Sequence, residues 1–313
     1  MPKTYLPSPD PKRVASMPRL PHPLLLLLLV VTACGRASDP SAGSMQVVDG
    51  LGRTVILATP PARVVSIAPG ATEIVLIAGA ERTLVGVTTA DDDSVDLPRI
   101  SALPLDTEAV LALQPDLIVA SEQVNDPAHA DLFDALGIPI LYLESGTWDG
   151  VLHSIEQVGD VLGTPVAAGR AVDSLVVRQR SLQEHTSNLT DRPTAIFLVS
   201  QETSWSFGRG SFVIDLMEWA GLDPLMKEFD APAPVLDDEW VLMRNPDVIL
   251  GAFAEDFSIG QLLEHHPTWA SLDAVRYQRV YRIHYSLILT PGPQNVEAAW
   301  EMARVVHPEV IQP

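Results

Sequence analysis

The sequence predicts an α/β fold in which short parallel strands alternate with helices in two similar halves. Its 313 residues are enough for two lobes, each with a hydrophobic core. Short runs rich in β-branched residues alternate with helical stretches, a pattern typical of a parallel sheet covered by helices. A helix–turn–strand motif near residue 108 recurs near residue 239, which indicates that one unit is used twice.

Strands are predicted where apolar runs lie between turn residues. They cover 46–48, 54–57, 64–67, 84–88, 117–120 and 140–143 in the first half, and 195–200, 248–250 and 280–283 in the second. Helices are predicted over 72–78, 107–113, 131–136, 212–220 and 239–243. A further helix begins at Thr164 and Pro165 and runs to about Leu189. At about 1.5 Å per residue this helix is about 36 Å long. Two interpretations stay open: a strut between two lobes or a surface helix of one lobe.

The repeat is the most informative feature of the chain. Glu108-Ala-Val-Leu111 leads to a Pro-Asp strand start at 115–119, and Glu239-Trp-Val-Leu242 leads to another at 246–250. The offset between corresponding positions is constant, since 239 − 108 equals 246 − 115. Each glutamate begins its helix, where the helix dipole stabilises a carboxylate. Because both copies carry it, Glu108 and Glu239 are predicted to form a spaced acidic pair for a two-fold partner with basic pockets.

Residues 1–33 are predicted to be a lipoprotein signal peptide. Four basic residues precede the apolar run 24–31, which is too short to span a bilayer as a helix. Residues 31–35, Val-Thr-Ala-Cys-Gly, resemble the bacterial lipobox, in which the cysteine is acylated, so Cys34 is the predicted lipidation site and membrane anchor. Met1 and Met17 both fit as the start. Residues 34–44 are predicted to form a flexible tether, and the protein is expected in the cell envelope, outside the cytoplasm.

Charge and cysteine content exclude two classes of protein. The chain holds 40 acidic and 20 basic residues, and without residues 1–33 the numbers are 39 and 16, a net charge of −23. Binding to nucleic acid requires clustered basic residues, so that class is excluded. The single cysteine excludes a disulfide framework.

No catalytic motif is present, so the protein is predicted not to be an enzyme and to use no cofactor. The sequence lacks a G-x-S-x-G elbow, a P-loop, C-x-x-C and H-E-x-x-H. The run 91–93, Asp-Asp-Asp, lacks the alternating oxygen ligands of a calcium loop and is interpreted as a solvated acidic loop. The run 265–267, His-His-Pro, is interpreted as a loop as well, and no metal site is predicted.

Ligand-binding residues are expected in the loops that follow the strands. The predicted contacts are Ser66, Pro69, Trp148, Trp205, Arg209 and Tyr285. Tryptophan and tyrosine supply stacking area, and arginine pairs with carboxylate or catecholate oxygens. The alternative is that Trp205 and Phe207 are buried under their loop while Arg209 lies in solvent.

Four motifs together resemble a family. They are 63–73 (Arg-Val-Val-Ser-Ile-Ala-Pro-Gly-Ala-Thr-Glu), the paired Glu/Pro-Asp units, 210–215 (Gly-Ser-Phe-Val-Ile-Asp) and 291–297 (Pro-Gly-Pro-Gln-Asn-Val-Glu). In order and spacing they resemble the iron-complex and cobalamin substrate-binding proteins of ABC importers. The resemblance implies two Rossmann-like lobes with parallel-rich sheets, at 45–163 and 190–313, joined by one long rigid helix at 164–189, with the ligand in a cleft between the lobes.

The same resemblance implies a solute receptor, monomeric, that delivers a metal chelate to a permease dimer with its ATPase. By position, Glu108 and Glu239 are the residues that dock on the permease. The loop at 89–93 lacks the aromatic residue common in cobalamin binders, and Gln294 replaces the usual arginine, so ferric siderophore, haem and corrinoid all stay open. Arg209, Arg276 and Arg282 favour an anionic iron complex slightly. The alternatives are a receptor for a bare metal ion and a surface α/β hydrolase.

Overall fold

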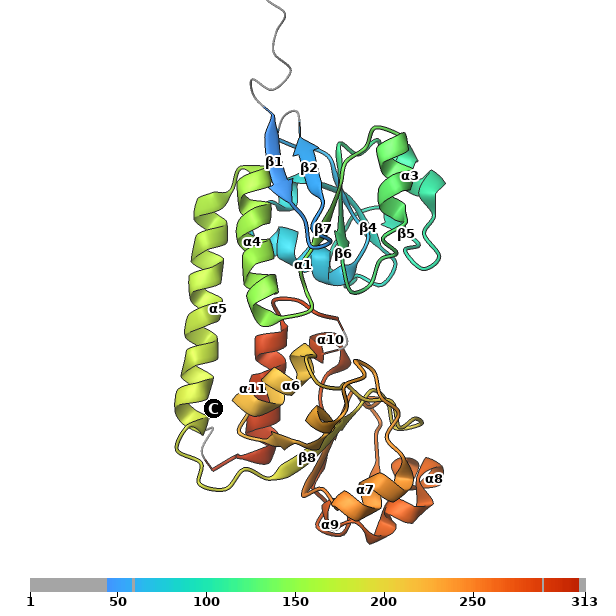
Figure 1. Cartoon of the computed structure of the whole chain (residues 1–313), viewed down its shortest axis with the longest axis vertical. Coiled ribbons are helices and arrows are strands. Elements are labelled where there is room, and N and C mark those ends of the chain that lie inside the picture. The colour runs from blue at the N-terminus through green and yellow to red at the C-terminus, as the bar shows by residue number, and fades with distance from the viewer. Residues whose placement is uncertain (1–43, 58–59, 289, 310–313) are drawn as a thin grey trace, which may run out of the picture. The chain divides into compact units, whose positions relative to one another are not determined.

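The computed structural model describes residues 44–57, 60–288 and 290–309. Cys34, the predicted signal peptide and the tether as far as residue 43 lie outside the described residues. Within the described residues, two parallel sheets follow one another along the chain (Figure 1). No helix of the described residues is long and apolar enough to cross a membrane.

The first half contains a five-stranded parallel sheet in the order β5-β4-β3-β6-β7. The strands are β3 (Val64–Ser66), β4 (Leu84–Thr88), β5 (Arg99–Ile100), β6 (Leu117–Ser121) and β7 (Ile140–Leu143). An antiparallel hairpin, β1 (Met45–Val48) and β2 (Thr54–Leu57), precedes it. The helices are α1 (Pro69–Ile77), α2 (Thr107–Ala112), α3 (His129–Ala135) and α4 (Trp148–Leu162).

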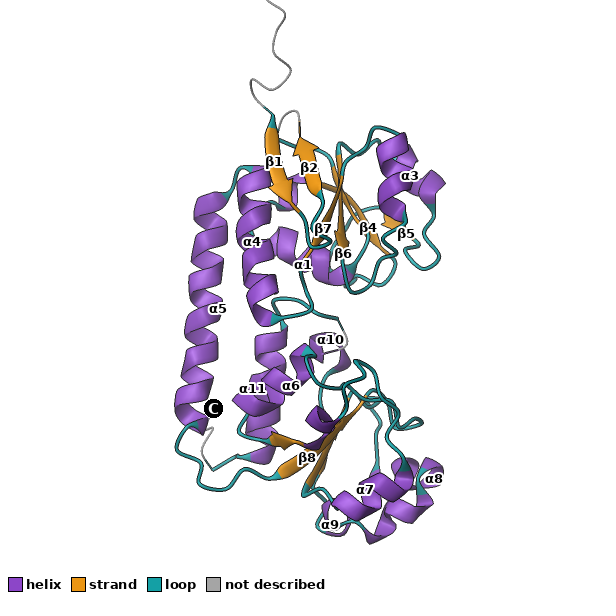
Figure 2. Ribbon diagram, viewed as in Figure 1, coloured by secondary structure: helices purple, strands orange, loops and turns teal. Residues whose placement is uncertain are grey.

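The second half contains a four-stranded parallel sheet in the order β11-β10-β8-β9 (Figure 2). The strands are β8 (Thr194–Leu198), β9 (Asp223–Pro224), β10 (Val248–Gly251) and β11 (Val280–Arg282). The helices are α6 (Phe212–Trp219), α7 (Asp238–Arg244), α8 (Ile259–His265), α9 (Asp273–Arg276), α10 (Tyr285–Ile288) and α11 (Asn295–Val306). The predicted α/β fold with parallel sheets is confirmed.

Alternate residues of the first sheet fill two hydrophobic clusters, one on each face. Val65 and Ile118 pack in a cluster with Phe133 of α3. Their neighbours Val64 and Leu117 face the other way, into a cluster that includes residues of α1 and α4 and continues into the second half. Both faces are covered, which explains why these strands are continuous apolar runs in the sequence.

The repeat is a structural copy, as the sequence predicts. Helix α2 begins at Thr107 and helix α7 at Asp238, and the side chains of Asp106 and Asp237 cap them. Asp116 accepts a hydrogen bond from the backbone N–H of Arg63 at 2.8 Å, and Asp247 accepts one from Thr194 at 2.9 Å. The caps and the carboxylates before β6 and β10 therefore occupy matching positions in the two halves.

Helix α5 (Pro165–Thr186) contacts helices of both halves, as the strut interpretation predicts. Arg178 forms a bidentate ion pair with Glu297 of α11, at 2.7 and 2.8 Å, and lies 4.5 Å from the ring centre of Trp300. Toward the first half, Gln179 accepts a hydrogen bond at 3.0 Å from the indole of Trp148, at the start of α4. The helix is thus fixed at its middle to α4 and α11.

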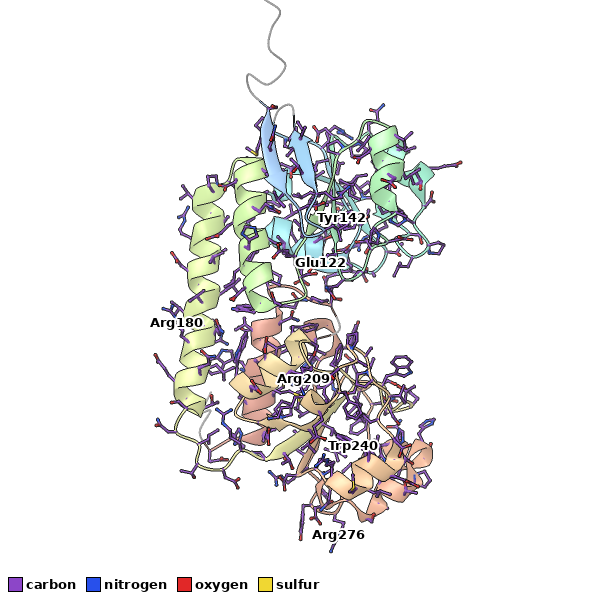
Figure 3. The ribbon with its side chains drawn as sticks, in the orientation of Figure 1. Glu122, Tyr142, Arg180, Arg209, Trp240 and Arg276 are labelled. Atoms are coloured by element: carbon purple, nitrogen blue, oxygen red, sulfur yellow. The ribbon has the colours of Figure 1, made fainter. Side chains whose placement is uncertain are left out.

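Replacing Arg178 with alanine should lower the free energy of unfolding by about 1 kcal/mol, because a half-exposed ion pair and a cation–π contact are lost together. Arg180→Ala is the matched control, since Figure 3 shows Arg180 on the outer side of the same helix. Urea denaturation of both variants measures the difference. Equal losses in the two variants would show that the Arg178 contacts add nothing to stability.

Helix α4 is missing from the prediction, which expects Trp148 in a loop that follows a strand. The signals for it are present: the Thr147 side chain caps the helix, Gly163 ends it with φ of +78°, and Val151, Ile155 and Val158 follow helical spacing. Tyr285, also predicted in a loop, begins the short helix α10.

Candidate functional site

The loops at the carboxyl ends of the strands enclose two cavities, each lined by residues of both halves of the chain. This is where an open α/β sheet binds its ligand. We call them the acidic cavity and the mixed cavity. The two halves belong to one compact unit, Pro40–Pro313.

The acidic cavity has a volume of about 740 Å³. It is lined by Pro69, Thr72, Glu73 and Leu76, by residues 89–95 and 285–287, and by Thr290 and Gln294. Four of these described lining residues are carboxylic acids and none is basic. Its walls therefore carry a strong negative potential.

An arginine behind the cavity fixes the acidic loop. The guanidinium of Arg99 donates hydrogen bonds of 2.7–3.1 Å to four backbone carbonyls of this loop, those of Thr88, Asp91, Asp92 and Val95. Asp91 accepts bonds of 2.7 Å from both the backbone N–H and the hydroxyl of Thr88. The loop is thus held in place by Arg99, which forms no ion pair with any described carboxylate.

Glu73 has an unusual pKa. Its pKa is raised from 4.5 to about 7, chiefly by burial and in addition by the charges of Asp91 and Asp92, while a hydrogen bond from the backbone of Gln294 partly opposes the rise. The pKa of Asp92 is lowered by hydrogen bonds from the Ser94 hydroxyl and backbone N–H. Near neutral pH, then, Asp92 is ionised while Glu73 is divided between its neutral and charged forms.

The mixed cavity has a volume of about 540 Å³ and combines both charges with aromatic surface. It is lined by residues 122–124, 146–147, 209–212 and 232–233, and by Phe207 and Pro291. Glu122 accepts hydrogen bonds of 3.2 Å from the backbone N–H groups of Ser145 and Gly146. Arg209 pairs with Asp230 at 3.1 Å. Figure 3 shows Glu122 and Arg209 on the facing edges of the two halves.

A close contact between α1 and the loop before α11 separates the two cavities. A Cβ atom on Gly70 would lie 2.2 Å from the carbonyl oxygen of Pro291, so only glycine allows this approach. Thr290 lines the acidic cavity and Pro291 lines the mixed cavity. Each cavity can therefore present its own chemistry to a different part of one ligand.

The structure brings together three of the six predicted ligand contacts. Pro69 and Tyr285 line the acidic cavity and Arg209 lines the mixed cavity. Tyr285 is 61% exposed, so its ring is available for stacking.

The other three predicted contacts lie elsewhere. Ser66 is 0% exposed, and its hydroxyl bonds to Ala68 and Thr72, which stabilises the turn into α1. Trp148 is 6% exposed because it packs edge-on against Trp219. Trp205 is 49% exposed but lines neither cavity. The placement of these three side chains does not support ligand contact.

Two of the arginines that favoured an anionic ligand also lie outside both cavities. Arg276 pairs with Asp273, and Arg282 contacts His284.

His266, from the run interpreted as a loop without a metal, is buried and stacks on Trp269 with ring centres 4.2 Å apart. Among the described residues, no group of three or more His, Cys, Asp or Glu side chains is placed to hold a metal ion.

Sequence reasoning misses the acids as part of the site. Asp92 and Asp93 are exposed, as expected of a solvated loop, but Asp91 is buried and all three line the acidic cavity. Glu73 of the acidic cavity and Glu122 of the mixed cavity are not among the predicted contacts. Their position in the sequence could have indicated this role, because each of these acids lies in or next to a segment that follows a strand.

Comparison with known proteins identifies the family. A family described as periplasmic binding protein matches residues 64–287. The chain belongs to this family. The resemblance inferred from the motifs is confirmed.

The chain is similar to curated proteins over most of their length. It is 25% identical to "Uncharacterized ABC transporter substrate-binding lipoprotein YvrC" of Bacillus subtilis, over 92% of this chain and 96% of that protein. It is 24% identical to a vitamin B12-binding protein of Vibrio campbellii, over 78% of this chain and 88% of that protein. In fold, it resembles a periplasmic heme binding protein from Pseudomonas aeruginosa with a TM-score of 0.72 at 21% identity, covering 80% of this chain and 94% of that chain.

Proposed function

We propose that this protein is the extracytoplasmic receptor of an ABC importer, which captures a metal chelate and delivers it to the permease. The observation that carries the proposal is the pair of cavities lined by both halves, at the carboxyl ends of their strands. Membership in the periplasmic binding protein family supports a binding role rather than catalysis. The relatives named as an ABC transporter lipoprotein and a vitamin B12-binding protein support the importer and the ligand class.

The geometry of Glu108 and Glu239 supports their role as docking residues. Each is the second residue of its helix, after an aspartate cap, and both side chains are exposed. Neither side chain makes a hydrogen bond or ion pair with any described residue. An ABC permease dimer has two equivalent subunits, so it can offer two equivalent binding sites, one for the glutamate of each half.

The anchor completes the proposal. We assign the acylated residue to Cys34, which places the receptor at the membrane face where its permease lies. The relative named as a lipoprotein supports this assignment. The strongly acidic surface avoids anionic headgroups, so the lipid is the expected membrane contact.

Ligand binding to the purified protein tests the function. Protein isolated from rich medium should show visible absorption of a corrin, haem or ferric complex, or should bind one such chelate on titration with a dissociation constant below about 1 µM. The probes are cyanocobalamin, haemin, ferrioxamine B and a ferric tris-catecholate, with Fe³⁺ and Zn²⁺ alone as controls. Binding of the bare ions instead of the chelates would favour the metal-ion receptor, and binding of none would refute the proposal.

A further inference from the structure

The acidic cavity restricts the charge of the ligand. Glu73, Asp91, Asp92 and Asp93 line it, and the nearest base, Arg99, lies behind the loop with its donors directed to backbone carbonyls. A ligand with carboxylate, catecholate or propionate groups would bring further negative charge against this wall. Such a ligand gains no compensating ion pair there, since none of the described lining residues is basic.

Two side chains of the same cavity carry an acceptor oxygen that has no donor within the described structure. Asp91 is only 8% exposed; its Oδ2 is bonded to Thr88, whereas its Oδ1 has no hydrogen bond to any described residue. The side-chain oxygen Oε1 of Gln294 is fully buried and unpartnered among the described residues. An unsatisfied buried acceptor is costly unless a ligand or water supplies the donor. That cost applies to the Gln294 oxygen, whereas Oδ1 of Asp91 is not fully buried and is open to a donor from the cavity. Both oxygens favour an occupant that brings N–H or O–H groups.

We propose that the acidic cavity binds the donor-bearing face of an uncharged or cationic chelate, with ammonium or amide N–H groups directed to Asp91, Asp93 and Gln294. This inference rests on the proposed function and names the ligand class within it. It differs from the expectation of an anionic iron complex, which rested on three arginines in the sequence. Two of them, Arg276 and Arg282, lie outside both cavities. Among the described residues that line the two cavities, Arg209 is the single cationic side chain, and it pairs with the exposed carboxylate of Asp230.

Paired probes that differ in charge test the inference. Ferrioxamine B carries a pendant ammonium group, its N-acetylated form is the same iron complex without that charge, and cyanocobalamin presents neutral amides. The anionic probes are haemin and a ferric tris-catecholate. Calorimetry at pH 7.5 should show at least tenfold tighter binding of a cationic or neutral probe than of either anionic probe.

Charge removal within the cavity should then weaken the bound probe. The variant Glu73→Gln with Asp93→Asn should lose at least tenfold in affinity for ferrioxamine B, or about fivefold for cyanocobalamin, since the amides keep an acceptor oxygen but lose the charge. Asp96→Asn is the matched control, because Asp96 is exposed close to the same loop but does not line the cavity. Its affinity should equal that of the wild type.

The salt dependence of binding by the wild-type protein is a further test that does not depend on whether the variants fold. Binding of ferrioxamine B should weaken when NaCl rises from 20 to 300 mM, and binding of its acetylated form should weaken less. Tighter binding of an anionic probe, or unchanged affinity in the double variant, would overturn the inference while leaving the receptor function intact. Binding of no probe would refute the receptor function, and the inference with it.

Discussion

Uptake should fall at least about a hundredfold when Glu108 and Glu239 are both replaced by alanine, because truncating one partner of a buried interfacial charge pair costs about 2–5 kcal/mol. The affinity of the purified protein for its ligand should stay unchanged. Neither residue lines the acidic or the mixed cavity, and neither forms an ion pair with any described residue, so ligand binding should not depend on them. Uptake of the chelate by cells that carry the variant, together with calorimetry, measures the two effects separately.

The control is a double variant that loses the same two negative charges at positions outside the repeat. Glu156 of α4 and Glu264 of α8 are exposed helical glutamates, one in each half. Glu156→Ala with Glu264→Ala should leave uptake at the wild-type rate. Normal uptake by the Glu108/Glu239 variant, or equal losses in both double variants, would contradict docking through the repeated acids.

The single variants add a test of the two-fold geometry. If the two glutamates engage equivalent pockets, Glu108→Ala and Glu239→Ala should each weaken the complex with the permease by a similar amount. The side chains of Asp106 and Asp237 both cap the helix that carries the glutamate, so the carboxylates have similar local settings. A large effect of one residue and none of the other would indicate contact with one subunit only.

The fold follows from sequence patterns that are local. Strands β6 and β10 are fully buried, and such strands appear as unbroken apolar runs after a Pro-Asp turn. Each of these strands keeps the same distance along the chain from its glutamate, Glu108 or Glu239, because the same cap, turn and strand are used twice. These features need no knowledge of distant contacts, which explains why they can be predicted.

The site depends on contacts that are not local. Trp148 resembles an exposed aromatic ligand residue, but α4 turns it against Trp219 from the other half. The run 91–93 has the composition of a solvated loop, and Asp92 and Asp93 are exposed. Asp91 is nevertheless buried, and all three line a cavity together with the segment near Tyr285, which belongs to the other half of the chain. Burial of a polar residue is set by which distant segment packs on it, and one sequence does not contain that information.

Glu73 provides a second strong effect, on stability rather than transport. Its pKa rises from 4.5 to about 7 in the folded protein, chiefly because burial disfavours its charged form. The groups around it are Asp91 and Asp92 from the loop after β4, whose charges add to the shift, and the backbone of Gln294, which opposes it. The folded state therefore binds this proton more tightly than the unfolded chain does.

The sign of the pH dependence follows from that difference in proton binding. Between about pH 4.5 and pH 7 the folded protein retains a proton that the unfolded chain loses, so stability falls as pH rises through this range. Glutamine stays neutral at every pH. Glu73→Gln should therefore gain about 2–3 kcal/mol of unfolding free energy relative to wild type between pH 5 and pH 8.

Urea denaturation of the ligand-free protein at pH 5 and pH 8 measures this gain. Glu81→Gln removes the same charge from an exposed position in the same half, and it controls for the change in net charge. A difference between Glu73→Gln and wild type that is the same at both pH values would show that Glu73 is ionised in the folded protein. The cavity would then carry its full negative charge at neutral pH without the proton assigned to Glu73.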